Sequence, residues 1–313
     1  MNKIKFGIIG CGYQTQKNMA PSMTNSNYAE IVGFYDIDIK KSQILADKYL
    51  VHQYLTLSEL FKNESIDAIY IATPTSTHEE LCILSADAGK HILCEKSLAM
   101  NVGQAENIVN KCKENNVFLM EGFMYQYHTQ HQFVKEMILN NEIGEPITFN
   151  AWFGFPSFPK SDFRMNKAMG GGAILDAGAY VVHAARTFFG SEPIQTESFI
   201  NYGENRLDIH GSVLMDFGEG RAAHLTFGMD NFYKNSYSVW GTKGELTLLR
   251  AFSIPEGLQP KCRLSKQSLV TEFTLPSCNH FEKELEVFYS SIKSNQFYFN
   301  EIINQATALA KLM

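Results

Sequence analysis

A short apolar run that ends in a pair of glycines restricts the fold of this chain more than any other feature. Residues 4–9 read IKFGII, and Gly10-Cys11-Gly12 follows directly. Such a run predicts a buried parallel strand, and the two glycines predict a tight turn into a helix. The first glycine permits the turn. The second lets the backbone approach a pyrophosphate, whose charge the free N–H groups at the helix start can then meet.

The next strand supports a dinucleotide site. Residues 31–35 form a second apolar run that ends in Asp36, about two dozen residues after Gly12, which is the spacing of a carboxylate that accepts ribose hydroxyls. The third small residue of the fingerprint falls at Thr15 instead of Gly or Ala, so the match is incomplete. The order of strand, turn, helix, strand and acid predicts a nicotinamide-type dinucleotide. The alternative is that Asp36 only caps the next helix.

Length and charge narrow the classes of protein. The chain has 313 residues, which is enough for two domains and a large core. Its net charge of −6 disfavours nucleic acid or an anionic membrane as the main partner. The six cysteines show no C-x-x-C spacing, and the nine histidines are scattered, so we expect reduced thiols and no metal site. No signal peptide or long apolar run is present, which predicts a cytoplasmic protein.

The first 121 residues alternate between strand and helix patterns. This alternation predicts an α/β fold, a Rossmann doubly wound parallel sheet, whose ligands collect at the carboxyl ends of the strands. We therefore expect an NAD(P)-binding Rossmann domain over 1–121. Further strands are expected at 68–72, 91–95 and 117–120, and helices at 40–49, 58–62, 78–88 and 102–114.

The remaining part of the chain, 122–313, predicts a second α+β domain for substrate binding and dimerisation. Strand patterns dominate 194–274 and indicate an open, mostly antiparallel sheet. Because aromatic residues on such a sheet need a cover, we expect a homodimer through it. Other elements are expected at 130–140, 147–155, 173–189, 281–293 and 301–313, and the C-terminal helix is expected to pack back on the first domain.

Three further stretches carry a family resemblance. Residues 72–78 read ATPTSTH, residues 94–98 read CEKSL, and residues 170–180 read GGGAILDAGAY. Together with the glycine turn, these stretches resemble the Gfo/Idh/MocA oxidoreductases over essentially the whole chain. Residues 237–245 and 249–252 are similar to the branch that contains sugar 3-ketoreductases of deoxysugar biosynthesis.

Lys96 is the first candidate for catalysis. A lysine at the carboxyl end of a central strand can hydrogen-bond a substrate hydroxyl and favour the alkoxide that develops as hydride moves. The alternative is a solvated surface lysine. The family's Glu-Lys-Pro motif makes Lys96 catalytic by resemblance, with Ser97 in place of its proline.

Asp176, Tyr180 and His183 are spaced i, i+4 and i+7, so they share one face of the predicted helix. Relatives that resemble glucose-fructose oxidoreductase and dihydrodiol dehydrogenase have Tyr at the position of Tyr180. The resemblance makes Tyr180 the general acid in ketone reduction or the general base in alcohol oxidation, with Lys96 stabilising its anion. Asp176 is expected to orient a substrate hydroxyl. His183 is either a partner of these residues or a core histidine.

The resemblance also assigns the cofactor contacts. NAD is expected over NADP, because Asp36 repels a 2′-phosphate and Ile37, not an arginine, follows it, although Lys40 and Lys41 lie a little further on. The residues carried over are Gly10, Gly12, Tyr13, Gln14, Asp36, Thr73, Pro74, His78, Glu95 and Lys96.

The substrate pocket is expected between Lys96 and Tyr180. Aromatic platforms with a few hydroxyl-seeking groups suit a sugar ring. Arg164 can hold a phosphate or carboxylate, or it can form an ion pair with Asp162. The substrate candidates are Tyr125, Trp152, Phe153, Arg164, Asp176 and His183, with Tyr127, His128 and Phe155 nearby.

These observations predict an NAD(P)-dependent oxidoreductase that moves a hydride to or from a secondary alcohol or ketone of a sugar, such as a nucleotide-sugar ketoreductase. A trans-dihydrodiol or aldose (xylose or glucose) dehydrogenase is the alternative among enzymes. A catalytically silent regulator that senses the dinucleotide is the alternative of another class. The presence of both Lys96 and Tyr180 argues against that last alternative.

Overall fold

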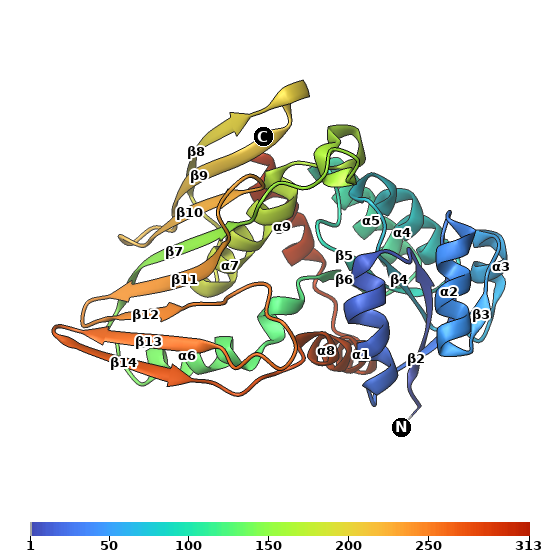
Figure 1. Cartoon of the computed structure of the whole chain (residues 1–313), viewed down its shortest axis with the longest axis horizontal. Helices are drawn as coiled ribbons and strands as arrows, with labels where there is room; N and C mark the ends of the chain where they lie inside the picture. Colours follow the sequence, from blue (N-terminus) through green and yellow to red (C-terminus); the bar gives the residue numbers. More distant parts are fainter. Residues whose placement is uncertain (1) are drawn as a thin grey trace. The chain divides into compact units, whose positions relative to one another are not determined.

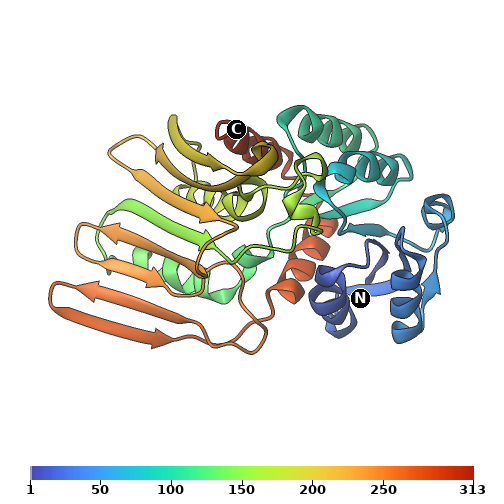
Figure 2. The same cartoon turned by 45° about the horizontal axis from the view of Figure 1, so that its top comes forward.

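The computed structural model, which describes residues 2–313, divides into two compact units (Figures 1 and 2). The first unit runs to Met124 and includes Phe281–Ala306, and the second comprises Tyr125–His280 and Thr307–Met313. The domain boundary predicted from the sequence lies at residue 121, with all later residues in the second domain. Residues 281–306 join the first unit because Phe288 packs on Phe6 and Phe118, with ring centroids 5.4 and 5.2 Å apart.

The first unit is built on a six-stranded parallel sheet of order β3-β2-β1-β4-β5-β6. This is the strand order of doubly wound dinucleotide-binding sheets, so the predicted Rossmann fold is confirmed. Parallel strands end on one edge of the sheet, and the loops after β1, β2, β4 and β5 meet there. The strands are β1 (Ile4–Ile9), β2 (Ala29–Tyr35), β3 (His52–Gln53), β4 (Ala68–Ile71), β5 (His91–Glu95) and β6 (Leu119–Gly122).

Helices cover this sheet. The apolar core includes Ile71 and Ile92 of the sheet and Ile302 of α9. Phe288 of α8 contacts Phe6 of β1. The helical elements are η1 (Thr15–Met19), α1 (Ala20–Asn25), α2 (Ile39–Tyr49), α3 (Leu57–Lys62), η2 (Thr75–Thr77), α4 (His78–Asp87), α5 (Val102–Glu114), η3 (Met124–Tyr127), α8 (His280–Ser294) and α9 (Phe299–Ala310). None of the helices in residues 2–313 combines the length and apolar character needed to span a bilayer.

The second unit is built on an eight-stranded sheet of order β14-β13-β12-β11-β7-β10-β9-β8 (Figure 1). All neighbours are antiparallel except β7 and β10, so the predicted mostly antiparallel sheet is confirmed. The strands are β7 (Pro146–Gly154), β8 (Gln195–Tyr202), β9 (Asp208–Asp216), β10 (Ala222–Gly228), β11 (Lys234–Gly241), β12 (Glu245–Leu248), β13 (Lys261–Lys266) and β14 (Leu269–Thr274).

Two helices, α6 (Thr129–Leu139) and α7 (Ala179–Phe189), cover one face of the eight-stranded sheet. Phe149 of β7 stacks on Phe188 of α7 with centroids 5.2 Å apart, and Tyr237 of β11 stacks on His131 of α6 at 5.6 Å. Successive residues of a strand point to opposite faces, so Phe149, Ala151 and Phe153 are buried under the helices. The other face of the sheet carries Trp152 and Trp240 at the alternate positions.

The segment that leads into α7 is not the single α-helix that the sequence predicts from residue 173. It begins with a π-helical turn, η6 (Ile174–Gly178), before α7 starts at Ala179. Asp208 of β9 is buried, and its Oδ2 accepts a hydrogen bond from the backbone N–H of Ile174 at 2.6 Å. Gly172 has φ +119°, and a Cβ there would lie 2.3 Å from Asp208 Oδ1. The glycine therefore lets the carboxylate reach and hold the start of this helix.

Candidate active site

The candidate residues fall into two groups, one in each unit. The first group lies at the carboxyl edge of the parallel sheet, in the loops after β1, β2, β4 and β5. The second group surrounds η6 and the first turns of α7. The sequence analysis named members of both groups.

The glycine turn after β1 has two glycines with different roles. Gly10 has φ +97°, and a Cβ at this position would lie 2.4 Å from the carbonyl oxygen of Ala72, directly after β4. A Cβ at Gly12 would meet no atom within 4 Å. Gly10 is therefore required by the packing of the turn, whereas Gly12 leaves room above the backbone for a ligand.

Thr15 accounts for the incomplete glycine fingerprint. Its side chain is fully buried, and its Oγ1 donates a hydrogen bond to the carbonyl oxygen of Gly10 at 2.6 Å. Gln16 Nε2 likewise donates to the carbonyl oxygen of Cys11 at 2.7 Å. Two side chains of the following helical segment thus hold the turn by hydrogen bonds to its carbonyl groups. The Thr15 hydroxyl bond stands where the fingerprint has a closely packed small residue.

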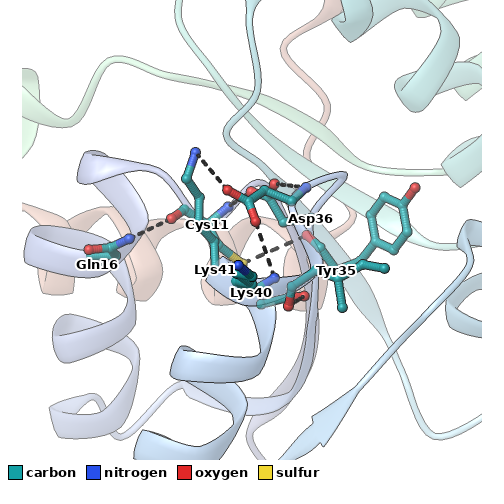
Figure 3. A network of polar contacts seen from close by, with 9 residues as sticks. Cys11, Gln16, Tyr35, Asp36, Lys40 and Lys41 are labelled. Carbon is teal, nitrogen blue, oxygen red and sulfur yellow. Dashed lines mark hydrogen bonds and ion pairs between the residues drawn. The ribbon is translucent and has the colours of Figure 1, made fainter.

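Asp36 faces the glycine turn (Figure 3). Its Oδ2 accepts from the N–H of Cys11 at 2.6 Å, and its Oδ1 accepts from the N–H of Asp38 at 2.7 Å. The N-cap of α2 is Asp38, whose side chain accepts from the N–H of Lys40. The alternative in which Asp36 only caps this helix is therefore wrong, because the cap lies two residues further on.

These residues fit a dinucleotide. The space above Gly12 suits a pyrophosphate, and Asp36 presents a fixed carboxylate at the end of the adjacent strand, where an adenosine ribose is bound in this fold. Tyr13 is 74% exposed beside the turn. Gln14 Oε1 accepts from Asn18 Nδ2 at 2.8 Å, and Gln14 also favours the charged form of Glu95.

His78 lies beneath the loops. Its ring is buried, with Nε2 2.9 Å from the carbonyl oxygen of Thr73 and Nδ1 3.0 Å from the carbonyl oxygen of Ser97. Burial lowers the pKa of His78, so the ring is neutral. His78 is predicted from the sequence to contact the cofactor. In the structure its ring lies between the Thr73-Pro74 loop and the loop that carries Lys96, and a neutral imidazole donates to one of the two carbonyl oxygens and packs against the other.

Glu95 ends β5 and Lys96 follows it directly, and both side chains are half-buried. The hydroxyl of Tyr70 donates to Glu95 Oε1 at 2.6 Å. Burial raises the pKa of Glu95, while Tyr70, Lys96 and Gln14 act in the opposite direction. The Lys96–Ser97 peptide bond is cis, and Leu98 donates its N–H to Glu121 Oε1 at 2.8 Å. Hydrogen bonds on both sides therefore hold this loop.

Tyr180 lies within an aromatic wall in the second unit. Its ring centroid is 5.1 Å from that of Phe153, 5.7 Å from that of Tyr125 and 5.9 Å from that of Phe252. Phe252 is a member that sequence reasoning missed, since nothing in its local pattern shows that the loop after β12 returns to α7. The wall fixes the ring by shape, because aromatic pairs in edge and tilted geometries have few alternative packings.

His183 lies one turn after Tyr180. Its Nδ1 is 2.7 Å from the hydroxyl of Tyr125, which packs on Tyr180. Burial, with the nearby Arg186 charge, lowers the pKa of His183 to about 3. The ring is therefore neutral at physiological pH and shares a hydrogen bond with the Tyr125 hydroxyl. Of the two interpretations of His183, this geometry favours a partner of the Tyr180 wall.

Arg164 is bracketed by two carboxylates. Its Nε lies 3.3 Å from Asp176 Oδ2, and its Nη1 lies 3.1 Å from Asp162 Oδ1. The guanidinium also stacks over Phe158 and Phe163, at 4.6 and 4.7 Å from the ring centroids. The ion pair with Asp162 is thus present, and Arg164 also holds Asp176 at the start of the helix that leads to Tyr180.

Trp152 and Phe153 do not share a pocket, contrary to the sequence prediction. Phe153 points to the covered face and contacts Tyr180, whereas Trp152 points to the opposite face, where Lys234 Nζ lies 3.9 Å from its ring centroid. The alternation of side chains along β7 separates them. Phe155 contacts Phe153 with centroids 5.5 Å apart, and His128 caps α6 by accepting from the N–H of Gln130.

Comparisons with known proteins identify the family. Residues 4–123 match the model described as the oxidoreductase family, NAD-binding Rossmann fold, and residues 131–247 match the GFO/IDH/MocA C-terminal domain. The chain belongs to the Gfo/Idh/MocA oxidoreductase family. Its first unit is accordingly an NAD(P)-binding Rossmann domain, as the glycine turn and Asp36 indicate.

Relatives in this family act on sugars. The chain is 30% identical to a dTDP-3,4-didehydro-2,6-dideoxy-alpha-D-glucose 3-reductase of Saccharopolyspora spinosa, over 93% of this chain and 88% of that protein. It is 25% identical to a D-xylose 1-dehydrogenase (NADP(+)) of Haloferax volcanii, over 93% and 90%. The crystal structure of KijD10, a 3-ketoreductase from Actinomadura kijaniata in complex with NADP and TDP-benzene, matches with TM-score 0.94 and 28% identity, covering 99% and 97% of the two chains.

The two glycines of the turn allow a matched test. We expect Gly10→Ala to destabilise the first unit by about 1–3 kcal/mol, because a Cβ cannot avoid the Ala72 carbonyl and the positive φ disfavours alanine. Gly12→Ala has space for its methyl group, so we expect normal stability but weakened dinucleotide binding. Urea unfolding and cofactor titration separate the two effects. Equal stability loss in both variants would contradict this assignment.

Buried neutral histidines predict a loss of stability in acid. Burial lowers the pKa of His183 and His131 to about 3, from 6.5. The unfolded chain therefore binds more protons between these values, and stability is lost as the pH falls below 6.5. We expect His183→Asn to reduce the loss between pH 7 and 5 by about 1–2 kcal/mol. The exposed His224 provides the control, and His224→Asn should leave the pH dependence of urea unfolding unchanged.

Proposed function

We propose that this protein transfers a hydride between a nicotinamide dinucleotide and a secondary alcohol or ketone of a sugar, with a nucleotide-linked sugar as the favoured substrate. The observation that carries the proposal is the pairing of a dinucleotide-fitting glycine turn with Lys96 in a tightly held loop after β5. The aromatic wall around Tyr180 supports it, since a sugar ring stacks on such surfaces.

The proposed chemistry assigns one task to each residue. The bound nicotinamide supplies the hydride for ketone reduction and accepts it in the reverse direction. The phenol of Tyr180 donates a proton to the ketone oxygen, and its phenolate takes that proton back in alcohol oxidation. The Lys96 ammonium stabilises the negative charge that develops on the substrate oxygen and on the phenolate.

Asp176 and Arg164 complete the substrate side of the proposal. Asp176 accepts a hydrogen bond from a substrate hydroxyl, and Arg164 holds the Asp176 carboxylate in place through their ion pair. Asp162 occupies the other side of the guanidinium. Arg164 therefore fixes the position of the Asp176 carboxylate. Arg164 could bind a substrate phosphate only after breaking its ion pair with Asp162.

The name of the Saccharopolyspora spinosa relative favours a nucleotide-linked ketosugar, and that of the Haloferax volcanii relative favours a free aldose. Both substrates use the same proton and hydride transfers, so the site residues alone do not choose between them. Product analysis with nucleotide-linked and free sugars makes the choice. Turnover of free sugars alone would favour the dehydrogenase alternative.

The catalytic assignment is tested by removing one functional group at a time. We expect Lys96→Met and Tyr180→Phe each to lower kcat by about 100-fold or more, because each loses a group that stabilises the transition state. Dinucleotide binding should remain. Lys111→Met and Tyr202→Phe are the controls, since they make the same changes at residues outside the candidate site, on α5 and β8. Near-normal turnover in either active-site variant would disprove the mechanism.

We also propose that NAD is preferred over NADP. The Asp36 carboxylate is held by two backbone N–H groups, so it cannot easily turn away from a 2′-phosphate. Ile37 follows it and is exposed, and it provides no positive charge for that phosphate. The solved relative from Actinomadura kijaniata contains NADP, so the proposed preference for NAD rests on Asp36 and Ile37 of this chain and not on that relative.

Replacing Asp36 tests the preference. We expect Asp36→Ser to remove the repulsion and to shift the ratio of the dissociation constants for NAD and NADP towards NADP by about 10-fold or more, a change of about 1.4 kcal/mol. Asp38→Ser provides the control, because it changes the α2 cap two residues away. A wild-type protein that binds NADP more tightly than NAD would overturn the proposal.

A homodimer through the open face of the eight-stranded sheet completes the proposal. Paired residues bring Phe199, Ser212, Thr226 and Trp152 into one row across β8, β9, β10 and β7. Phe199 is 82% exposed, and Leu214 and Trp240 are also exposed. Apolar residues gathered on a flat face support a self-complementary interface.

We expect Leu214→Asp to convert the dimer to a monomer, because the interface would then have to bury a charge on its apolar face. Light scattering at micromolar protein concentration measures the mass. Leu139→Asp, at the end of α6, introduces the same charge at an exposed leucine off the sheet face and should leave the mass unchanged. A wild-type monomer would remove the proposal.

The cytoplasmic location and the domain limits remain proposals. The six cysteines have free thiols, and five of them are buried, which suits a reducing compartment. We propose an NAD(P)-binding domain up to about residue 121 and a substrate-binding domain beyond it. The segment 281–306 is structurally part of the first.

A further inference from the structure

Glu284 is an acid in an apolar position with no use in the proposed mechanism. It lies on α8 in the first unit, and only 1% of it is exposed. Neither of its carboxylate oxygens has a hydrogen-bond partner among residues 2–313. The neighbouring positions Leu285 and Phe288 are apolar and buried, as expected for the inner face of this helix. Burying a carboxyl group without a hydrogen-bond partner costs folding free energy, so the presence of Glu284 here points to a specific role.

Glu95 is the group whose charge acts on Glu284. The two side chains interact electrostatically, and Tyr70 on β4 interacts with both of them. Tyr70 is fully buried and donates its hydroxyl hydrogen to Glu95 Oε1. Cys94 on β5 also acts on Tyr70, and the Lys96 charge acts on Glu95. Glu284, Glu95 and Tyr70 are therefore three acidic groups that interact with one another near the end of β5.

Only one of the two carboxyl groups can keep its charge in such surroundings. Burial raises the pKa of Glu95 as well, but Tyr70, Lys96 and Gln14 all favour its charged form. Glu284 has none of these, and burial together with the Glu95 charge raises its pKa well above the usual range. The proton of the pair therefore resides on Glu284. A protonated carboxyl group is a hydrogen-bond donor, and Glu95 is the acceptor at hand.

We propose that Glu284 is a positioning residue for Lys96: as an uncharged acid it donates its hydrogen to Glu95 through one buried water molecule, and it holds Glu95 as a charged neighbour of Lys96. The inference rests on the proposed function for Lys96. Tyr70 and Glu284 would then support Glu95 from two elements, β4 and α8, and Glu95 would orient the adjoining lysine. Charge on Glu284 would add a second anion beneath the lysine and disturb this geometry.

Infrared spectroscopy tests the protonation directly and without reference to turnover. We expect the wild-type protein at neutral pH to show the carbonyl stretch of a protonated carboxylic acid, and Glu284→Gln to lack it. Glu286→Gln is the matched control two residues along the same helix, where Lys283 Nζ lies 2.8 Å from the carboxylate. That variant should keep the band. A wild-type spectrum without the band, or a band unaffected by Glu284→Gln, would overturn the proposal.

The pH dependence of stability provides a second readout. A raised pKa in the folded state means that stability is lost as the pH rises through that pKa. The urea midpoint of Glu284→Gln should therefore gain on that of the wild type as the pH increases. Glu286→Gln should show the opposite trend, because Lys283 lowers the pKa of Glu286. Parallel curves for Glu284→Gln and the wild type would contradict the proposal.

Turnover then tests the positioning role. Glutamine keeps a donor of the same shape, so we expect Glu284→Gln to retain kcat within about threefold, whereas Glu284→Leu should lower it by about 10-fold or more with KM little changed. If both variants retain kcat, or both lose it equally, the positioning role is wrong. If Lys96→Met proves active while the infrared band is present, the proposed function fails and the protonated state of Glu284 stands.

Discussion

Close backbone packing between neighbouring parallel strands is the constraint on which the first unit depends. β1 and β4 end so near each other that only a glycine at position 10 avoids the carbonyl oxygen of Ala72. This crowding forces the chain into a turn, and the turn brings the backbone N–H of Cys11 to the Asp36 carboxylate (Figure 3). The feature that defines the ligand site is thus a consequence of how the strands pack.

The loops at this edge are held by buried polar groups whose charge the fold suppresses. Burial lowers the pKa of His78, and its neutral ring lies between the carbonyl groups of two loops and donates to one of them. Tyr70 donates to Glu95 from inside the sheet. Each of these groups loses solvation on burial and regains a hydrogen bond, so the loops resist displacement. A lysine next to such loops is presented at a defined place, as electrostatic stabilisation of a transition state requires.

In the second unit, the alternation of side chains along β7 assigns neighbouring aromatic residues to different tasks. Phe153 joins the wall around Tyr180, and Trp152 joins the opposite face beside Lys234. Sequence analysis could foresee the strand but grouped both residues in one pocket. Arg164 shows a similar division, since it pairs with both Asp162 and Asp176. The local sequence pattern indicates which residue types can take part in chemistry, and the geometry of the strand determines which of them lie on the same face of the sheet.

The sequence by itself determined the fold class, the glycine turn, Asp36 and the two candidate catalytic residues, because strand periodicity and motif spacing are properties of short segments. Tertiary structure alone decided the roles of Thr15, His78 and Phe252, whose partners lie in other segments or loops. It also brought α8 to the first unit and placed Glu284 beside Glu95, which are far apart in the chain. Burial and long-range contact set the charge of such groups, and neither can be seen in a local pattern.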